Sequence, residues 1–185
     1  MFSARPQHGA DGTHDVDLGK LNAPFFFGAL GDDLQFLPSA AGNIGVTFDL
    51  GHGLFIPVVK NAANLSLREI AKAMMAFRMK ALRANFQAAD LSGGDLSLSI
   101  NMDADLLFVQ PIILPPQTCM ISVGAVQTEL VRDAGQGLLE RRYVYLGVAF
   151  DHRAINGFEA NAFASAIKAQ VEDASAFLPG CSGPA

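Results

Sequence analysis

The chain is poor in the features that mark several protein classes. Only 17% of its 185 residues are charged and 50% are hydrophobic, which excludes an intrinsically disordered protein and favours one compact domain. Its 13 basic residues are scattered and its formal net charge is -5, so neither nucleic acid nor an anionic membrane is expected as a partner. No segment approaches the ~18 consecutive apolar residues of a membrane span, and no signal-peptide core is found at the N-terminus.

Cysteine and catalytic motifs are equally sparse. The two cysteines, Cys119 and Cys181, lie far apart, and no CxxC or Cys/His spacing is present, so neither a disulfide framework nor a metal site is expected. This cysteine usage favours a soluble cytoplasmic protein. Because GxGxxG and GxSxG motifs are also absent, histidines and hydroxyl groups are the remaining candidates for chemistry.

The distribution of hydrophobic residues predicts one domain with loose ends. Residues 1–19 and 179–185 have no hydrophobic periodicity and are expected to form a flexible lead-in and a flexible tail around a domain at residues 20–178. A turn is expected at residues 51–53, and a polar hairpin region is expected around residues 133–137. Extended segments are expected at residues 22–27, 34–37, 43–49, 54–60, 95–101, 119–126 and 143–150. Their alternation with helices predicts an α/β fold with a mixed β-sheet packed against helices.

Two helices are predicted from apolar spacing. Ser66 and Glu69 form a capping box ahead of a helix that ends near Arg83. Its periodic apolar residues are Leu67, Ile70, Ala71, Met74, Phe77 and Leu82. The last helix is expected from Gly157 to about Ala174, with an inner face of Phe158, Ala162, Phe163, Ala166 and Ile167.

Residues 95–101 alternate strictly between apolar and polar side chains. Leucine and isoleucine occupy one side of the predicted strand, and Ser97, Ser99 and Asn101 occupy the other. The segment therefore reads as a half-buried strand whose polar face is available for chemistry.

The four histidines differ in their surroundings. His8 and His14 lie in the lead-in and are expected to be solvated, and His52 is expected to be a turn residue. His152 follows an apolar strand and precedes a helix, a junction at which general bases are commonly placed. Periodicity alone leaves a structural and a catalytic role for His152 about equally favoured.

Several blocks of sequence resemble one family. Residues 151–157, Asp-His-Arg-Ala-Ile-Asn-Gly, are similar to the DHRxxDG signature of the catalytic domain of 2-oxoacid dehydrogenase dihydrolipoyl acyltransferases, relatives of chloramphenicol acetyltransferase. Further blocks resemble the same family in its order, at residues 43–49, 53–60, 66–71, 91–94 and 111–117. The resemblance implies a chloramphenicol acetyltransferase-like α/β fold that is shortened at its N-terminus.

The resemblance also implies a reaction. An acyl group, expected to be acetyl, would pass from a coenzyme A or dihydrolipoyl thioester to a thiol or a small-molecule hydroxyl, without an acyl-enzyme. His152 matches the family's general base, a role that suits an imidazole because its ordinary pKa is about 6.5. Ser99 matches the serine that donates a hydrogen bond to the oxyanion. Asn156 replaces the family's aspartate, from which we expect weaker ordering of the site.

The resemblance implies partners as well. It predicts a homotrimer, or a larger symmetric assembly, with the active site at a subunit boundary, and acyl-CoA or coenzyme A as substrate. No lipoyl attachment site is expected, since Lys60 reads as the family's strand-end lysine, and a second chain would supply the missing N-terminal part or a carrier domain.

Two functions stay open at this point. Asp103 and Asp105, in the loop after Ser99, depart from the family pattern and favour an enzyme recruited to a biosynthetic pathway. The alternative is a catalytically weakened core-forming or binding subunit of a 2-oxoacid dehydrogenase-type complex. Asn156 and the shortened N-terminus favour this alternative, whereas the retention of both His152 and Ser99 favours the enzyme.

Overall fold

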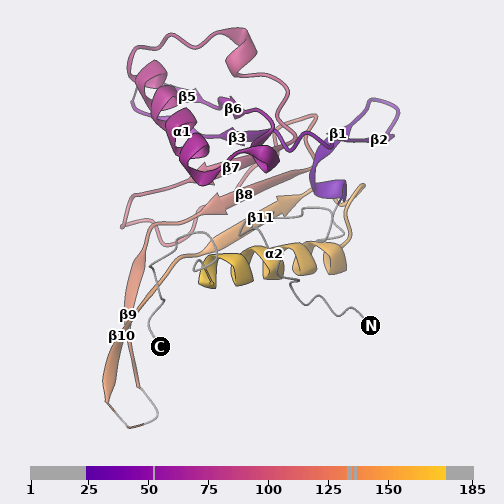
Figure 1. Cartoon of the computed structure of the whole chain (residues 1–185). Coiled ribbons are helices and arrows are strands. Elements are labelled where there is room, and N and C mark those ends of the chain that lie inside the picture. The colour runs from indigo at the N-terminus through magenta and orange to yellow at the C-terminus, as the bar shows by residue number, and fades with distance from the viewer. Residues whose placement is uncertain (1–23, 52, 133–134, 136, 174–185) are drawn as a thin grey trace, which may run out of the picture.

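A five-stranded mixed β-sheet organises the chain, and the two long helices, α1 and α2, lie on opposite sides of it (Figure 1). The computed structural model describes residues 24–51, 53–132, 135 and 137–173. The strand order is β11-β8-β7-β3-β6, with bounds Leu146–Phe150, Cys119–Val123, Leu96–Ile100, Ile44–Val46 and Val58–Val59. The central strand β7 is parallel to both of its neighbours, and the outer pairs are antiparallel. The predicted mixed sheet packed with helices is confirmed.

Three two-stranded ribbons extend from this sheet. They are β1–β2 (Gly28–Leu30 and Phe36–Pro38), β4–β5 (Phe48–Asp49 and Leu54–Phe55) and β9–β10 (Gln127–Arg132 and Leu138–Tyr143). The turn expected at residues 51–53 falls between β4 and β5, but its central residue, His52, lies outside the described residues, as do His8 and His14. Short 3₁₀ turns complete the chain at Pro24–Phe26 (η1), Ala62–Asn64 (η2) and Ala88–Asp90 (η3).

Three expected extended segments had the wrong bounds. Residues 24–26 form the η1 turn rather than a strand, and the strand starting at Cys119 ends at Val123 instead of residue 126. The strand expected from residue 143 begins at Leu146. The polar segment between these two strands forms its own ribbon, β9–β10, because its residues pair with one another and not with the sheet.

Helix α1 (Leu67–Leu82) begins at the predicted capping box, in which Ser66 accepts a hydrogen bond from the Glu69 N–H. Its inner side buries Ala81 and partly buries Met74 and Phe77. Leu67, Ala71 and Leu82 are exposed, so only part of the predicted periodic apolar set faces the rest of the chain. Neither helix in the described part of the chain is long and apolar enough to cross a membrane.

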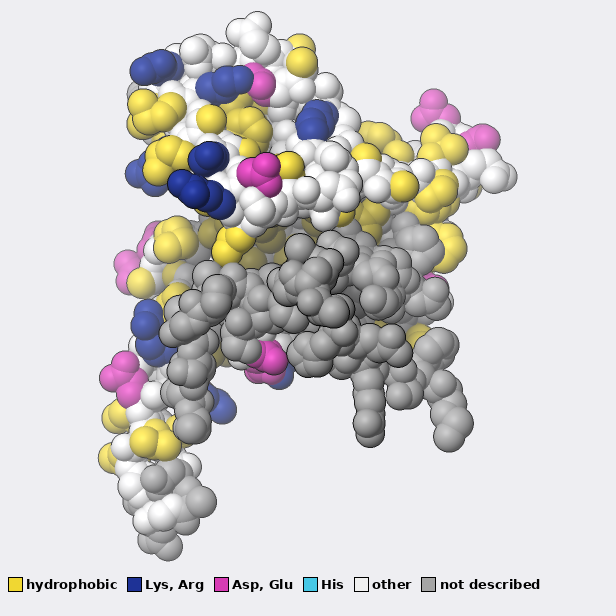
Figure 2. Space-filling view, viewed as in Figure 1, with side chains coloured by type: hydrophobic (Ala, Val, Ile, Leu, Met, Phe, Trp, Pro, Cys, Tyr) yellow, Lys and Arg dark blue, Asp and Glu magenta, His cyan; other side chains and the backbone are white. Residues whose placement is uncertain are grey.

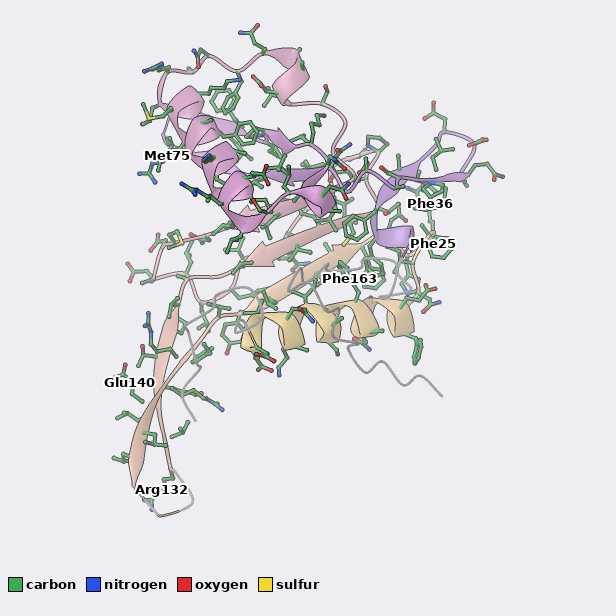
Figure 3. The ribbon with its side chains drawn as sticks, viewed as in Figure 1. Phe25, Phe36, Met75, Arg132, Glu140 and Phe163 are labelled. Atoms are coloured by element: carbon green, nitrogen blue, oxygen red, sulfur yellow. The ribbon has the colours of Figure 1, made fainter. Side chains whose placement is uncertain are left out.

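Helix α2 (Gly157–Glu172) covers the hydrophobic core. The sheet face beneath it supplies the buried residues Leu96, Cys119 and Ile121, and Phe26, Phe27, Ile155, Ala160 and Phe163 complete the cluster. Phe163 points from α2 toward the sheet and stacks on Phe26 with ring centroids 4.0 Å apart (Figure 3). Phe158 is 77% exposed and Ala162 is also exposed, which corrects the predicted inner face. At 100° per residue Phe158 lies about 140° from Phe163 around the helix, so both rings cannot face the sheet.

Replacing Phe163 with alanine is expected to lower the free energy of unfolding by about 3–5 kcal/mol, because the stacked ring leaves a cavity beside Phe26. Urea denaturation measures this change. Phe158→Ala is the matched control on the same helix and should stay within about 0.5 kcal/mol of the wild type. Similar losses for both variants would contradict the orientation of α2.

Candidate active site

Ser99 lies on the sheet face opposite the core, near the end of β7. Its side chain is half-buried, whereas Ser97, on the same face, is fully buried and its Oγ has no hydrogen-bond partner. A Cβ at Gly45 would lie 2.6 Å from the Ser97 Oγ and 3.1 Å from Ile56. The Ser97 side chain therefore fills the space that the missing side chain of Gly45 leaves. The expectation that the whole polar face is available was therefore wrong for Ser97 and stands for Ser99.

The Ser99 hydroxyl has one polar partner among the described residues. Thr47 Oγ1 donates a long hydrogen bond of 3.5 Å to Ser99 Oγ. Ser122, opposite Ser99 on β8, donates to the Val109 carbonyl at 2.6 Å and is therefore committed elsewhere. The Ser99 proton thus has no acceptor in the described part of the chain and can be donated to a bound group. Sequence reasoning missed Thr47, although it lies in the quoted block at residues 43–49.

His152 lies in a turn at the C-terminal end of β11. The Asp151 N–H donates to the Thr118 carbonyl, and the Asp151 carbonyl accepts from the N–H groups of Ala154 and Ile155, which fixes the turn on the sheet edge. The His152 side chain is exposed, and its ring centroid lies 5.5 Å from that of Phe150. The imidazole is thus held on a rigid backbone with open access.

An ion pair spans the turn on either side of His152. The Arg153 guanidinium binds the Asp151 carboxylate at 2.6 Å, and the Arg153 N–H also donates to that carboxylate. The hydrogen bonds from the Arg153 side chain hold the pKa of Asp151 below its ordinary value, and those same bonds raise the pKa of Arg153. The two side chains therefore neutralise each other's charge at neutral pH.

Asn156 is the N-cap of α2. Its side-chain oxygen accepts from the Glu159 N–H at 3.0 Å, and the Glu159 carboxylate accepts from the Asn156 N–H at 3.1 Å. A neutral amide oxygen is among the best N-cap acceptors, so this local role does not require the carboxylate found in the family signature.

The strand register places Ser99 and His152 at opposite ends of the sheet. Ser99 is level with Ser122 on β8, which is level with Gly147 on β11, and His152 lies five residues beyond Gly147. With strands about 4.8 Å apart and rising about 3.3 Å per residue, the two Cα atoms are roughly 15–20 Å apart. The two side chains therefore do not meet within one chain.

Other candidate groups do not form a site. Among the described residues no cluster of three or more His, Cys, Asp or Glu could hold a metal ion. Burial raises the pKa of the Cys119 thiol to about 12, so it is no nucleophile. Asp103 and Asp105 are exposed in the loop after β7, where the Asp105 N–H donates to the Asp103 carboxylate.

The fold and this divided arrangement define an α/β domain with an exposed histidine and a half-buried serine at opposite ends of one sheet. The family profile described as 2-oxoacid dehydrogenases acyltransferase (catalytic domain) matches residues 21–178. The chain belongs to this family.

Relatives and solved structures agree with this placement. The chain is 30% identical to the dihydrolipoyllysine-residue acetyltransferase component of the Mycobacterium tuberculosis pyruvate dehydrogenase complex, over 87% of this chain and 36% of the relative. It is 33% identical to the succinyltransferase component of the Cupriavidus necator 2-oxoglutarate dehydrogenase complex, over 89% of this chain and 42% of the relative. The chain thus spans well under half the length of these relatives.

A probable dihydrolipoamide acetyltransferase from Listeria monocytogenes superposes with a TM-score of 0.74 and 28% identity, over 82% of this chain and 64% of that one. An Azotobacter vinelandii dihydrolipoamide acetyltransferase has the same fold, with a TM-score of 0.73 and 23% identity over 84% of this chain and 64% of that one.

Asn156→Ala is expected to lower the free energy of unfolding by about 1 kcal/mol, because the Glu159 N–H loses its acceptor. Asn156→Asp keeps the acceptor and should match or slightly exceed the wild type, since a negative charge is favourable at a helix N-terminus. Chemical denaturation of the two variants checks both outcomes. Equal stability of Asn156→Ala and wild type would show that the cap contributes nothing.

Arg153→Leu is expected to raise the pKa of Asp151 toward its ordinary range, because the guanidinium that lowers it is gone. Since the folded pKa of Asp151 is depressed, its contribution to stability is present above its unfolded pKa of about 3.9 and is lost as the pH falls through the folded value. Carboxyl-carbon NMR titration measures the shift. An unchanged Asp151 pKa would rule out the ion pair as its cause.

Proposed function

We propose that the protein is an acyltransferase that moves an acyl group from a coenzyme A or dihydrolipoyl thioester to a thiol or a small-molecule hydroxyl. We also propose that each active site combines His152 of one copy with Ser99 of another. The observation that carries the proposal is the separation of the two residues across the sheet of a chain that belongs to an acyltransferase family.

The chemistry follows from the two side chains. The His152 imidazole takes the proton of the attacking thiol or hydroxyl while the sulfur or oxygen bonds to the thioester carbonyl carbon. The tetrahedral oxyanion accepts a hydrogen bond from Ser99, a contribution of about 2.7–4 kcal/mol to the barrier. When the carbon–sulfur bond of the donor breaks, the leaving thiolate takes the proton back from the imidazolium. No covalent acyl-enzyme forms.

Asn156 fits a role beside the base. The Azotobacter vinelandii structure was determined to study a serine, a histidine and an asparagine in the catalytic mechanism of that enzyme, the last two being four positions apart. His152 and Asn156 have the same spacing here. This parallel supports Asn156 as a positioning residue whose capped helix fixes the turn that carries His152, and it weighs against reading the amide as a sign of decay.

A shared site requires copies in contact, and the β9–β10 ribbon supports contact with a second copy. The ribbon projects away from the rest of the molecule (Figure 1), and Leu130, Leu138 and Leu139 on it are exposed. An isolated two-stranded ribbon is at best marginally stable in water, so a neighbouring copy is the natural support. A related fold forms the cubic core of a pyruvate dehydrogenase complex.

Mixing two inactive variants tests the shared site. Ser99→Ala and His152→Ala are each expected to lose at least about 100-fold in turnover. In trimers unfolded and refolded as an equimolar mixture, a His152 from one variant meets a Ser99 from the other at about one quarter of the boundaries. Activity should therefore recover to about a quarter of the wild type, measured by thiol release from acetyl-CoA with thiol or alcohol acceptors.

Each variant refolded alone is the control. Neither variant should recover activity alone. If the mixture also stays inactive, a site shared between chains is contradicted, and equal turnover by His152→Ala and wild type would contradict the base. A wild-type trimer that is inactive with every acceptor would favour the core-forming subunit instead.

A further inference from the structure

Helix α1 carries a second apolar stripe on its outer side. Leu67, Ala71, Met75, Met79 and Leu82 recur every three or four residues and are exposed. Met75 is 60% exposed and points away from the sheet (Figure 3). A helix that packs only against its own sheet presents polar residues at these positions, so the stripe has the character of a contact surface.

This outer face is also strongly basic. Arg68, Lys72, Arg78 and Arg83 flank the stripe, and none forms an ion pair with a carboxylate in the described part of the chain. Residues 67–83 contain these four cations, Lys80 and a single acidic residue, Glu69. Their net charge is therefore +4, although the whole chain carries -5. Figure 2 shows the basic and apolar side chains gathered over α1. Such a face fits an acidic partner with apolar side chains.

The β1–β2 ribbon has the complementary character. It projects from the molecule (Figure 1), its tip carries Asp32 and Asp33, and no cation lies between residues 28 and 38. Leu34 at the tip has a φ of +63° and is 60% exposed, so both its backbone conformation and its exposure are unfavourable for leucine. Leu37 beside it is exposed as well.

The two surfaces lie at the two ends of the sheet that the shared active site would join. The ribbon is attached at the His152 end, where the Leu30 N–H donates to the Pro116 carbonyl and Asp151 bonds to nearby Thr118. Helix α1 reaches the Ser99 end, where Phe77 contacts Phe48 just beyond β3. A head-to-tail contact that brings His152 to Ser99 therefore brings the end of the sheet that carries the ribbon to the end of the next copy that carries α1.

We infer that the tip of the β1–β2 ribbon docks on the outer face of α1 in a second copy of this chain. Leu34 and Leu37 lie against the stripe around Met75 and Met79, and the two aspartates face the flanking arginines. The inference rests on the head-to-tail assembly of the proposed function and adds the surfaces that hold it together.

Charge exchange tests the contact. Asp32→Lys with Asp33→Lys reverses the tip, and Arg68→Glu with Arg78→Glu reverses the helix face. Each double variant is expected to weaken self-association about tenfold or more in sedimentation velocity at low salt, and the two combined should restore it. Exchanging Lys168 and Glu172 on α2 keeps an existing ion pair and should change nothing.

Leu34→Gly separates docking from folding. Glycine accepts the positive φ, so the thermal stability of the monomer should hold or rise while self-association falls. Unchanged association in Leu34→Gly, or a failure of the combined charge variant to restore it, overturns the contact.

Two further outcomes distinguish a failure of the docking contact from a failure of the proposed head-to-tail assembly. Reassembled activity in the Ser99 and His152 mixture, with tip variants that associate like the wild type, would overturn the docking contact alone. A monomeric wild type would overturn both. If reversal of the helix face instead weakened binding of coenzyme A in calorimetry and left association intact, the face would be a polyanion site and the docking contact would be wrong.

Discussion

The parallel pairing of β7 with β3 and β8 is the constraint on which the rest of the molecule depends. It fixes Ser99 near one end of the sheet, and the antiparallel pairing of β11 with β8 returns the chain so that His152 emerges at the other end. A side chain reaches a few ångströms, whereas the register sets a separation of roughly 15–20 Å. No rotamer change joins the two groups within one chain, because a sheet cannot slip its register without turning its buried face to water. In the proposed function, the neighbouring copy is therefore required by the hydrogen-bonded backbone and not by any single residue of the site.

Local signals in the sequence predicted the elements that depend on interactions between residues close together in the chain. The capping box of Ser66 and Glu69 starts α1, and the alternation of residues 95–101 produces β7 with Ser99 on its polar face. Burial along these elements could not be predicted, because it depends on what lies above them. Ser97 and Ser99 are equivalent in the pattern, yet Gly45 and Ile56 enclose only Ser97. The inner face predicted for the last helix was wrong at Phe158 and Ala162 for a related reason: with 50% hydrophobic residues, apolar side chains outnumber core positions, and periodicity cannot choose between two apolar stripes.

Asn156 departs from the family signature, but its contacts show that it keeps a structural role at the start of α2. From sequence, an amide in place of a carboxylate indicated a weakened site. In the fold, the same oxygen caps α2 by accepting the Glu159 N–H, and Glu159 returns a bond to the Asn156 N–H. An amide and a carboxylate both supply this acceptor, so the difference is one of hydrogen-bond strength and not of geometry. The turn that carries His152 is also held independently, through the bonds of Asp151 to Thr118, Ala154 and Ile155.

The charge distribution bears on the symmetry of an assembly. Copies with a net charge of -5 repel one another at long range, and a two-fold contact centred on α1 would place its cations against those of α1 in the other copy. A head-to-tail contact instead places the cations of α1 opposite the aspartates of the β1–β2 tip. The same geometry is the one that joins the two halves of a divided active site, since His152 and the tip share one end of the sheet while Ser99 and α1 share the other. The proposed docking contact and the proposed shared active site therefore require the same orientation of neighbouring copies, and a head-to-tail contact closes into a ring when its rotation permits.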